Sequence, residues 1–459
     1  MYMVYFATEV INMKTLFFII VVSIAVSYGW GMRGMLIGGE RGAVLPGALL
    51  GMFLALFSGN AMISEHFYIF AAAGALGMAY GGFEPYAETM SFILHHKEGE
   101  HFPKKGYGGL VLKGALWFGI CGAVLGMSFS AVSGAYYKPL SLVIFLALIP
   151  LMQGVGVLLF NKPYDKENKK FPKLYLSIES REEWGGNLIM LICLLVFTLV
   201  NKDYYSVFFS LTGIVSGAIG WSIAITLYDF QAHPMKNGKY FFGKIQSYID
   251  GWKIMEYSLG AFTGLCLSIY FFATKDTMLA DRMNFAAANG GFRDVMGENS
   301  LLFALITVAC MFLVAIQYID AKPFNKVPFR FYELAERAIL FALPLIGVML
   351  GNEKSAQFTS FFLIVCFAAE KVIFERSKRI SGTRKLLTNL GFGIVAAAAL
   401  VIQIFFTVPP IAYILFYTIY YILAENSTIY KKEFFGSRYT VNGYFLVQSI
   451  FLIAVVLFI

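Results

Sequence analysis

Charged residues are scarce in this chain. Asp, Glu, Lys and Arg make up 14% of its 459 residues, whereas hydrophobic residues make up 58%. A soluble chain of this size carries about a quarter of its residues as charged side chains, so the composition excludes an ordinary soluble domain. Strict alternation of apolar and polar residues is also missing, which argues against a membrane barrel. Continuous apolar runs, long enough to cross a hydrocarbon core of about 30 Å, recur from end to end.

Cysteine is rare, and the familiar catalytic patterns are missing. No C-x-x-C, G-x-S-x-G or H-E-x-x-H motif occurs, and G-x-G-x-x-G at 29–34 follows an apolar run where a dinucleotide fold needs a strand. We therefore predict no disulfide, no metal site and no cofactor, with each cysteine acting as a small packing residue. The cysteines all lie inside apolar runs: Cys121, Cys193, Cys266, Cys310 and Cys366.

The apolar runs predict an all-α, polytopic membrane bundle of about fourteen transmembrane helices in one integral membrane domain. The predicted spans are 15–32, 43–59, 66–83, 108–131, 139–160, 184–200, 204–228, 251–274, 300–319, 333–351, 356–374, 388–407, 409–424 and 441–459.

Basic residues are distributed unequally between the two sets of connections. When connections are assigned alternately to the two sides, 26 of the 36 Lys and Arg residues fall on one side and 7 on the other. Cytoplasmic connections carry this excess, so we predict a plasma (inner) membrane protein with both termini outside the cytoplasm. The net charge of +8 then reflects contact with anionic lipid, and nucleic acid is not a predicted partner.

Parts of the sequence resemble other parts at fixed distances. Residues 108–122 resemble 250–264 at an offset of 142, and 39–51 resemble 335–347 at an offset of 296. We predict internal repeats of four helices that enter the membrane from the same side. The predicted units are 33–160, 182–319 and 333–424, flanked by spans 15–32 and 441–459.

Glycine is plentiful, with 44 residues, and many lie four apart in a predicted span. Helices in lipid associate through close backbone approach, which small residues permit, so these motifs predict a tight inner bundle. The motifs begin at Gly47, Gly77, Gly122, Gly213 and Gly260.

The few charges gather near the cytoplasmic ends of the predicted spans, which makes them the candidate site. An ionisable group in hydrocarbon costs about 2.5–3.5 kcal/mol or more, so it normally faces a partner or a wet cavity. We expect the group to line one charged cavity that is open to the cytoplasm. The candidate substrate-binding or coupling residues are Arg33, Glu40, Arg41, Glu84, Glu88, Lys113, Glu183, Trp184, Asn187, Asp229, Lys253 and Glu256.

Local patterns suggest how some of these residues are placed. Residues 33–42 are predicted to form a re-entrant turn, and Glu84 and Glu88 to share one helix face at the end of a span. Lys113 and Glu256 are predicted about one turn inside their helices.

Two simpler explanations remain open for individual residues. Glu40 and Glu183 open predicted spans, where the helix dipole alone favours a carboxylate. Trp184, near a membrane boundary, also fits an interfacial anchor.

Three functions fit this pattern. The first is a secondary transporter of a polar organic solute, with anions among the candidates, in which Arg33, Arg41 or Lys113 binds the solute and Glu40 or Glu256 carries a proton. The second is a membrane-embedded enzyme that acts on a lipid or lipid-linked substrate at the cytoplasmic face. The third is a channel or an assembly scaffold. The predicted partners are therefore a small polar solute and membrane lipid, and the sequence leaves the oligomeric state open.

Overall fold

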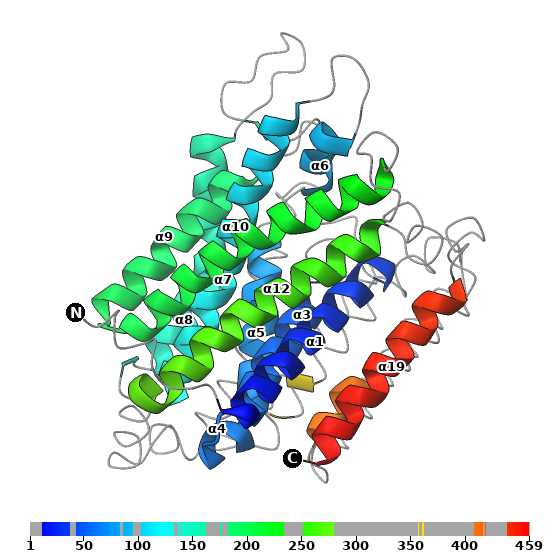
Figure 1. The fold of residues 1–459 in the computed structure, drawn as a ribbon. Coiled ribbons are helices and arrows are strands. Elements are labelled where there is room, and N and C mark those ends of the chain that lie inside the picture. The colour runs from blue at the N-terminus through cyan, green and yellow to red at the C-terminus, as the bar shows by residue number, and fades with distance from the viewer. Residues whose placement is uncertain are drawn as a thin grey trace, which may run out of the picture.

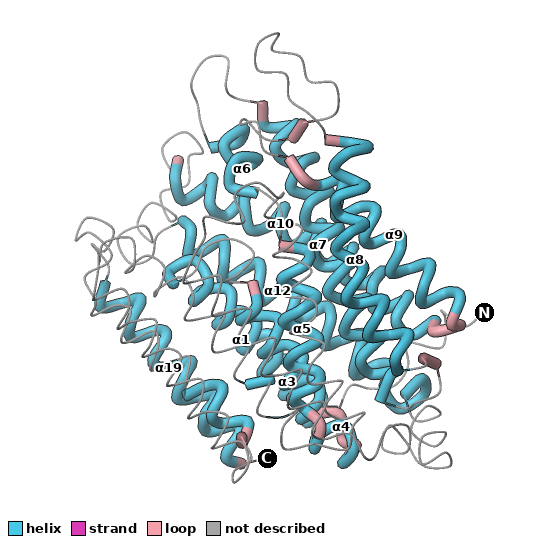
Figure 2. Tube along the Cα trace, turned by 180° about the vertical axis from the view of Figure 1, so that it is seen from behind, coloured by secondary structure: helices cyan, strands magenta, loops and turns pink. Residues whose placement is uncertain are grey.

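The structure is a computed structural model, and it describes residues 12–36, 43–82, 86–94, 102–132, 136–137, 139–161, 175–176, 182–233, 251–279, 357, 360–361, 408–415, 418 and 438–458. Predictions for the third repeat unit, 333–424, therefore lie almost entirely outside the described residues. Throughout the described ranges the regular structure is helical, as Figure 2 shows.

Long helices coincide with the first eight predicted spans and with the last. They are α1 (Met13–Leu36), α3 (Val44–Leu56), α5 (Phe67–Gly81), α7 (Pro103–Val132), α8 (Pro139–Phe160), α9 (Trp184–Val200), α10 (Tyr204–Ala232), α12 (Gly251–Thr274) and α19 (Arg438–Leu457). Short helices α4 (Ala61–Glu65) and α6 (Tyr86–Leu94) and a π-helical turn (Lys275–Leu279) accompany them. The total of about fourteen spans stays a prediction, since most residues of the other five predicted spans fall outside the described ranges.

Several helices have the length and outer surface of membrane spans. Four of those described are long and apolar enough to cross a membrane, namely segments Met13–Met32, Pro103–Ala131, Tyr204–Ala232 and Gly251–Thr277. Large apolar side chains on the outer face of α10 recur three or four residues apart and are 37–57% exposed. A soluble monomer rarely exposes so continuous an apolar stripe, so these helices indicate a membrane protein. The stripe consists of Phe208, Leu211, Val215, Ile219 and Ile223.

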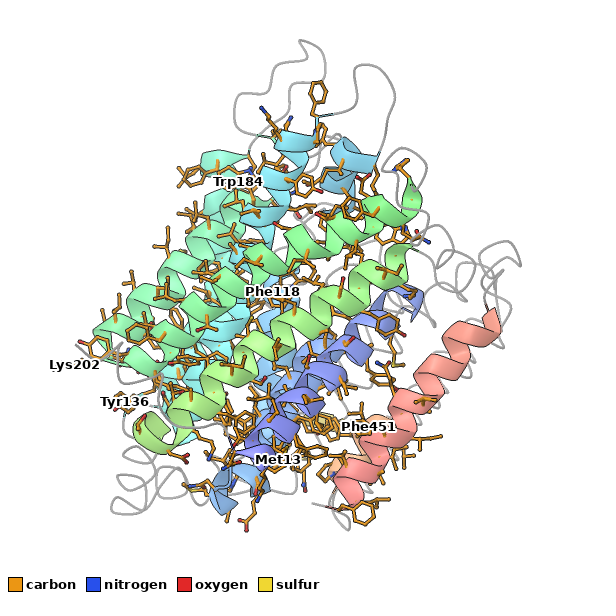
Figure 3. All side chains as sticks on the ribbon, in the orientation of Figure 1. Met13, Phe118, Tyr136, Trp184, Lys202 and Phe451 are labelled. Atoms are coloured by element: carbon orange, nitrogen blue, oxygen red, sulfur yellow. The ribbon has the colours of Figure 1, made fainter. Side chains whose placement is uncertain are left out.

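The helices run side by side along a common direction, as Figure 1 shows, with α19 at the margin of the bundle. Figure 3 places Trp184, at the start of α9, toward one end, and Met13, Tyr136 and Lys202 toward the other. We call these the Trp184 end and the Lys202 end. Met13 and the C-terminal end of α19 lie together at the Lys202 end, and the Ser449 hydroxyl of α19 bonds the Tyr28 hydroxyl of α1 at 3.1 Å.

Glycine brings the inner helices into backbone contact, as predicted. A Cβ atom at Gly47 of α3 would lie 2.1 Å from the carbonyl oxygen of Gly74 on α5. A Cβ atom at Gly217 of α10 would likewise lie 2.1 Å from the carbonyl oxygen of Gly114 on α7. Side chains at these positions would force the helices apart. All five predicted glycine motifs lie at such helix contacts, which confirms the tight inner bundle.

The predicted repeat agrees with one pair of helix contacts. In the first unit, Gly81 of α5 packs against Trp117 of α7. In the second unit, Gly220 of α10, 139 residues after Gly81, packs against Leu259 of α12, which lies 142 residues after Trp117. Elsewhere the units differ, because α3 packs closely on α5 whereas the corresponding α9 packs mainly on α8. The repeat stays a prediction.

Candidate functional site

Lys113 is one of the fully buried candidates among the described residues. It lies almost three turns into α7, and not one turn as predicted, because α7 begins at Pro103, ahead of the predicted 108. Its side chain is fully buried, and Nζ lies 2.8 Å from Glu182 Oε1. Nζ also donates a hydrogen bond of 2.9 Å to Thr89 Oγ1 on α6. Three segments distant in sequence therefore meet at this ammonium group.

Glu182 is the functional candidate that sequence reasoning missed. It is buried just ahead of α9, and its second oxygen, Oε2, accepts a hydrogen bond of 2.7 Å from the backbone nitrogen of Leu176. The sequence marks this position by two adjacent carboxylates, Glu182 and Glu183, at the start of an apolar run, but the predicted site includes only Glu183. Glu183 is the N-cap residue of α9 and is also buried, but its side chain makes no capping hydrogen bond.

Lys253 and Glu256 form a second buried ion pair, on α12. Their side chains lie one turn apart, with Lys253 Nζ 2.5 Å from Glu256 Oε2, as the predicted i,i+3 spacing requires. Lys253 Nζ also donates a hydrogen bond of 2.6 Å to the Gly31 carbonyl of α1. This lysine therefore joins α12 to the last turns of α1.

Aromatic rings contact one another on and beside the helices that carry the two ion pairs. Tyr86 of α6 contacts Trp221 of α10 with ring centroids 4.9 Å apart, Trp117 of α7 at 6.0 Å and Trp252 of α12 at 6.5 Å. Trp30 of α1 lies 5.3 Å from Trp117 and 6.5 Å from Trp221. Four of the five tryptophans of the chain thus gather at one place.

We call this assembly the charged–aromatic cluster. It lies toward the Trp184 end of the bundle and combines both ion pairs with these aromatic rings. Its members are Lys113, Glu182, Lys253, Glu256, Trp30, Tyr86, Trp117, Trp221 and Trp252.

Glycine makes room for these rings. A Cβ atom at Gly114 would lie 2.3 Å from Trp221 Cδ1, and one at Gly81 would lie 2.4 Å from Trp117 Cδ1. The indoles therefore rest directly on the backbones of α7 and α5. The glycines that pack the helices also hold the large rings of the cluster in place.

Three further candidates lie nearby but outside the cluster. Trp184 packs on Phe160 of α8, with ring centroids 5.5 Å apart. Asp229, in the last turn of α10, lies 3.1 Å from His233 Nδ1, and both side chains are partly exposed. Asn187 is fully buried, and its Nδ2 donates a hydrogen bond of 2.8 Å to the Gly81 carbonyl.

Two predicted local arrangements are wrong. Helix α1 continues to Leu36, so Arg33 lies on helical backbone. The predicted re-entrant turn at 33–42 is therefore wrong in its first four residues, which belong to this helix. Helix α5 ends at Gly81 and a separate helix, α6, begins at Tyr86, which places Glu88 in a first turn and not at the end of a span. The span prediction missed this boundary because it followed hydropathy alone.

The remaining candidates, Glu40, Arg41 and Glu84, lie outside the described residues, so their predicted place in the site is untested.

The two ion pairs are expensive to maintain. Removing a charge from water costs several kcal/mol, which its partner offsets only at close range, and loss of one partner typically destabilises a protein by about 3–5 kcal/mol. A buried pair joining separate helices can also exchange partners with a solute or a proton, which makes it a natural site of coupling in membrane proteins.

Comparison of this chain with models of protein families, with curated proteins and with solved structures finds no match.

Proposed function

We propose that this protein is a secondary transporter of a polar organic solute, and that the charged–aromatic cluster is its binding and coupling site. The observation that carries the proposal is that two buried ion pairs and one group of contacting aromatic rings share the helices α7 and α12. Ionisable groups inside membrane helices mark solute and ion pathways more often than they stabilise the fold.

Each part of the cluster has a role in this proposal. Lys113 and Glu182 hold α7, α6 and the segment before α9 together, and they hold the solute when that contact opens. Glu256 takes up the coupling proton, which weakens its pair with Lys253 and so changes the hold of this ammonium group on the Gly31 carbonyl of α1. Solute and proton would thereby act on different helix contacts of one site, as alternating access requires.

The Trp184 end would face the cytoplasm. The predicted excess of Lys and Arg lies in the connections at this end, and such connections are normally retained inside.

Burial favours a transporter over an enzyme that acts on lipid. An enzyme of that kind needs carboxylates open to a groove that lipid can enter. Glu182 and Glu256 are instead less than 5% exposed, and each lies next to a lysine.

Uptake into proteoliposomes tests the proposal. Purified full-length protein would be reconstituted and offered sugars, sugar acids and organic anions, with and without an inward proton gradient. We expect saturable uptake of at least one solute, faster with the gradient. If no solute enters while an added phospholipid or lipid-linked sugar is converted, the enzyme is the correct function.

Glu256→Gln is the sharpest variant for the coupling step. The amide keeps the shape of the carboxylate and cannot exchange a proton, so we expect counterflow of solute to persist while acceleration by the gradient disappears. Glu65→Gln is the matched control, since Glu65 is exposed at the Lys202 end. Equal acceleration of wild type and Glu256→Gln would show that Glu256 is not the coupling residue.

A further inference from the structure

Trp221 and Asn187 each bury a polar side-chain atom that has no hydrogen-bond partner among the described residues. Trp221 is fully buried, and its Nε1–H has no hydrogen-bond acceptor among the residues that the structure describes. Asn187 is fully buried as well, and its Oδ1 has no donor in the same described ranges. A buried donor or acceptor that gives up water without replacing it is destabilising, and few survive in folded proteins.

The two side chains that carry these atoms are both linked to Trp117. Trp221 lies 6.4 Å from Trp117, measured between ring centroids. Asn187 donates Nδ2 to the Gly81 carbonyl, and Gly81 rests against Trp117. The side chains that carry an unused donor and an unused acceptor are thus both linked to Trp117, one by ring contact inside the charged–aromatic cluster and the other through Gly81 at its border.

Trp117 shows that an indole N–H in this cluster can have a protein acceptor. Its Nε1 donates a hydrogen bond of 2.9 Å to the Met78 carbonyl of α5. Both tryptophans are fully buried, but only one N–H has a protein acceptor. This difference suggests that the N–H of Trp221 serves a group that comes from outside the protein.

The charges of the cluster narrow the chemistry of that group. Lys113 Nζ lies 2.8 Å from a Glu182 oxygen, and Lys253 Nζ lies 2.5 Å from a Glu256 oxygen. Within the described part of the cluster, each lysine thus lies next to one carboxylate, so these four ionised side chains together carry no net charge that would attract an anion or a cation.

We propose that the solute is neutral and carries several hydroxyl groups, in the manner of a polyol or a monosaccharide, and that it binds between Trp221 Nε1 and Asn187 Oδ1; this rests on the transport function proposed above. A hydroxyl group both accepts and donates hydrogen bonds, so neighbouring hydroxyls satisfy the indole N–H and the amide oxygen together. The C–H face of such a solute packs against the indole rings. A site built to bond hydroxyls also rejects analogues that lack them.

Binding is measured separately from transport, through the fluorescence of the cluster's own tryptophans. Full-length protein in nanodiscs would be titrated with glucose, myo-inositol and mannitol, and with glucuronate, citrate and glycine betaine. We expect at least one neutral compound to bind, and glucuronate, which has the hydroxyls of glucose and an added charge, to bind at least tenfold more weakly than glucose. Binding by the charged compounds alone, or by no compound of the panel, would overturn the inference.

The uptake assay separates this inference from the proposed function. Uptake of an anion alone would leave the transporter standing and refute the hydroxylated solute. Binding of a polyol or sugar without any uptake would support the hydroxylated ligand and refute the transporter.

A replacement of Trp221 by 3-benzothienylalanine tests the residue itself. This analogue keeps the two fused rings but lacks the N–H. We expect the melting temperature without solute to stay the same or rise, because an unpaired donor is removed, and the affinity for the solute to fall at least tenfold.

The same replacement at Trp117 is the matched control. It removes the hydrogen bond to Met78, so the melting temperature should fall while affinity changes less than threefold. If Trp221 serves only a fixed water molecule, its replacement will lower the melting temperature and leave affinity unchanged, and the inference is then wrong.

Discussion

The two ends of the bundle both bury carboxylates, but they stabilise them in different ways. At the Trp184 end, Glu182 and Glu256 lie against lysines, and the Glu182 pair joins segments far apart in the sequence. At the Lys202 end, Asp203 is fully buried at the N-cap of α10. Its Oδ1 accepts from the Ser206 backbone nitrogen at 3.2 Å, while Oδ2 accepts hydrogen bonds from the Ser206 hydroxyl and, at 2.6 Å, from the Tyr137 hydroxyl.

This difference shows that burial of a charge does not by itself identify a functional site. Asp203 caps a helix and closes the turn after α9, which accounts for its position in full. Helix capping does not account for Lys113, since this residue lies almost three turns inside α7, beyond the first turn in which capping and helix-dipole interactions act. The three predictions that follow test whether the two ends differ in function as they differ in structure.

The largest effect is expected from breaking the Lys113 pair. Lys113→Met leaves Glu182 buried without its cation, which should lower the free energy of unfolding by about 3–5 kcal/mol. The measurement is the yield of monodisperse protein in size-exclusion chromatography and its melting temperature in detergent.

A double variant separates folding from function at the same site. In Lys113→Met/Glu182→Gln both charges are removed, and the glutamine oxygen still accepts from Leu176, so folding should recover to near that of the wild type. Solute uptake should nevertheless stay at least tenfold reduced. Wild-type uptake by the folded double variant would mean that the pair is structural, and the contrast between the two ends would disappear.

A smaller effect is expected at the Lys202 end. Asp203→Ala removes a helix cap and leaves the buried Tyr137 hydroxyl without its acceptor, which should cost about 2 kcal/mol. Because this carboxylate is structural, the KM of solute uptake should match that of the wild type. A change in KM well beyond twofold would extend the functional site to both ends of the bundle. The control for the helix cap is Asp203→Asn, which retains a capping oxygen.

The smallest effect is expected at Asp229. It lies at the Trp184 end but contacts His233 near the surface, where an ion pair contributes about 0–1 kcal/mol. Asp229→Asn should therefore change the melting temperature by no more than a degree or two, and uptake by less than twofold. A strong loss of uptake in a well-folded variant would add this residue to the site.

Much of the described fold follows from hydropathy and glycine spacing. The predicted spans coincide with α1, α3, α5, α7 to α10, α12 and α19, because membrane helices satisfy their own backbone hydrogen bonds and each must bury a continuous apolar run. Boundaries at which the chain stays helical beyond its apolar run were misplaced, at Leu36 of α1 and Pro103 of α7. Glycine and local backbone hydrogen bonding fix such ends, and hydropathy does not report them.

The sequence by itself determined the class of this protein, the faces by which its inner helices pack, and the end of the bundle at which its charges gather. It did not determine which charges pair. The i,i+3 pair of Lys253 and Glu256 was foreseeable because helix geometry sets it. Only the tertiary structure decided that Lys113 meets Glu182, that four tryptophans converge, and that Trp221 and Asn187 keep unused polar atoms. These contacts join separate helices, so they depend on how each helix is rotated and displaced against its neighbours, which no single stretch of sequence encodes.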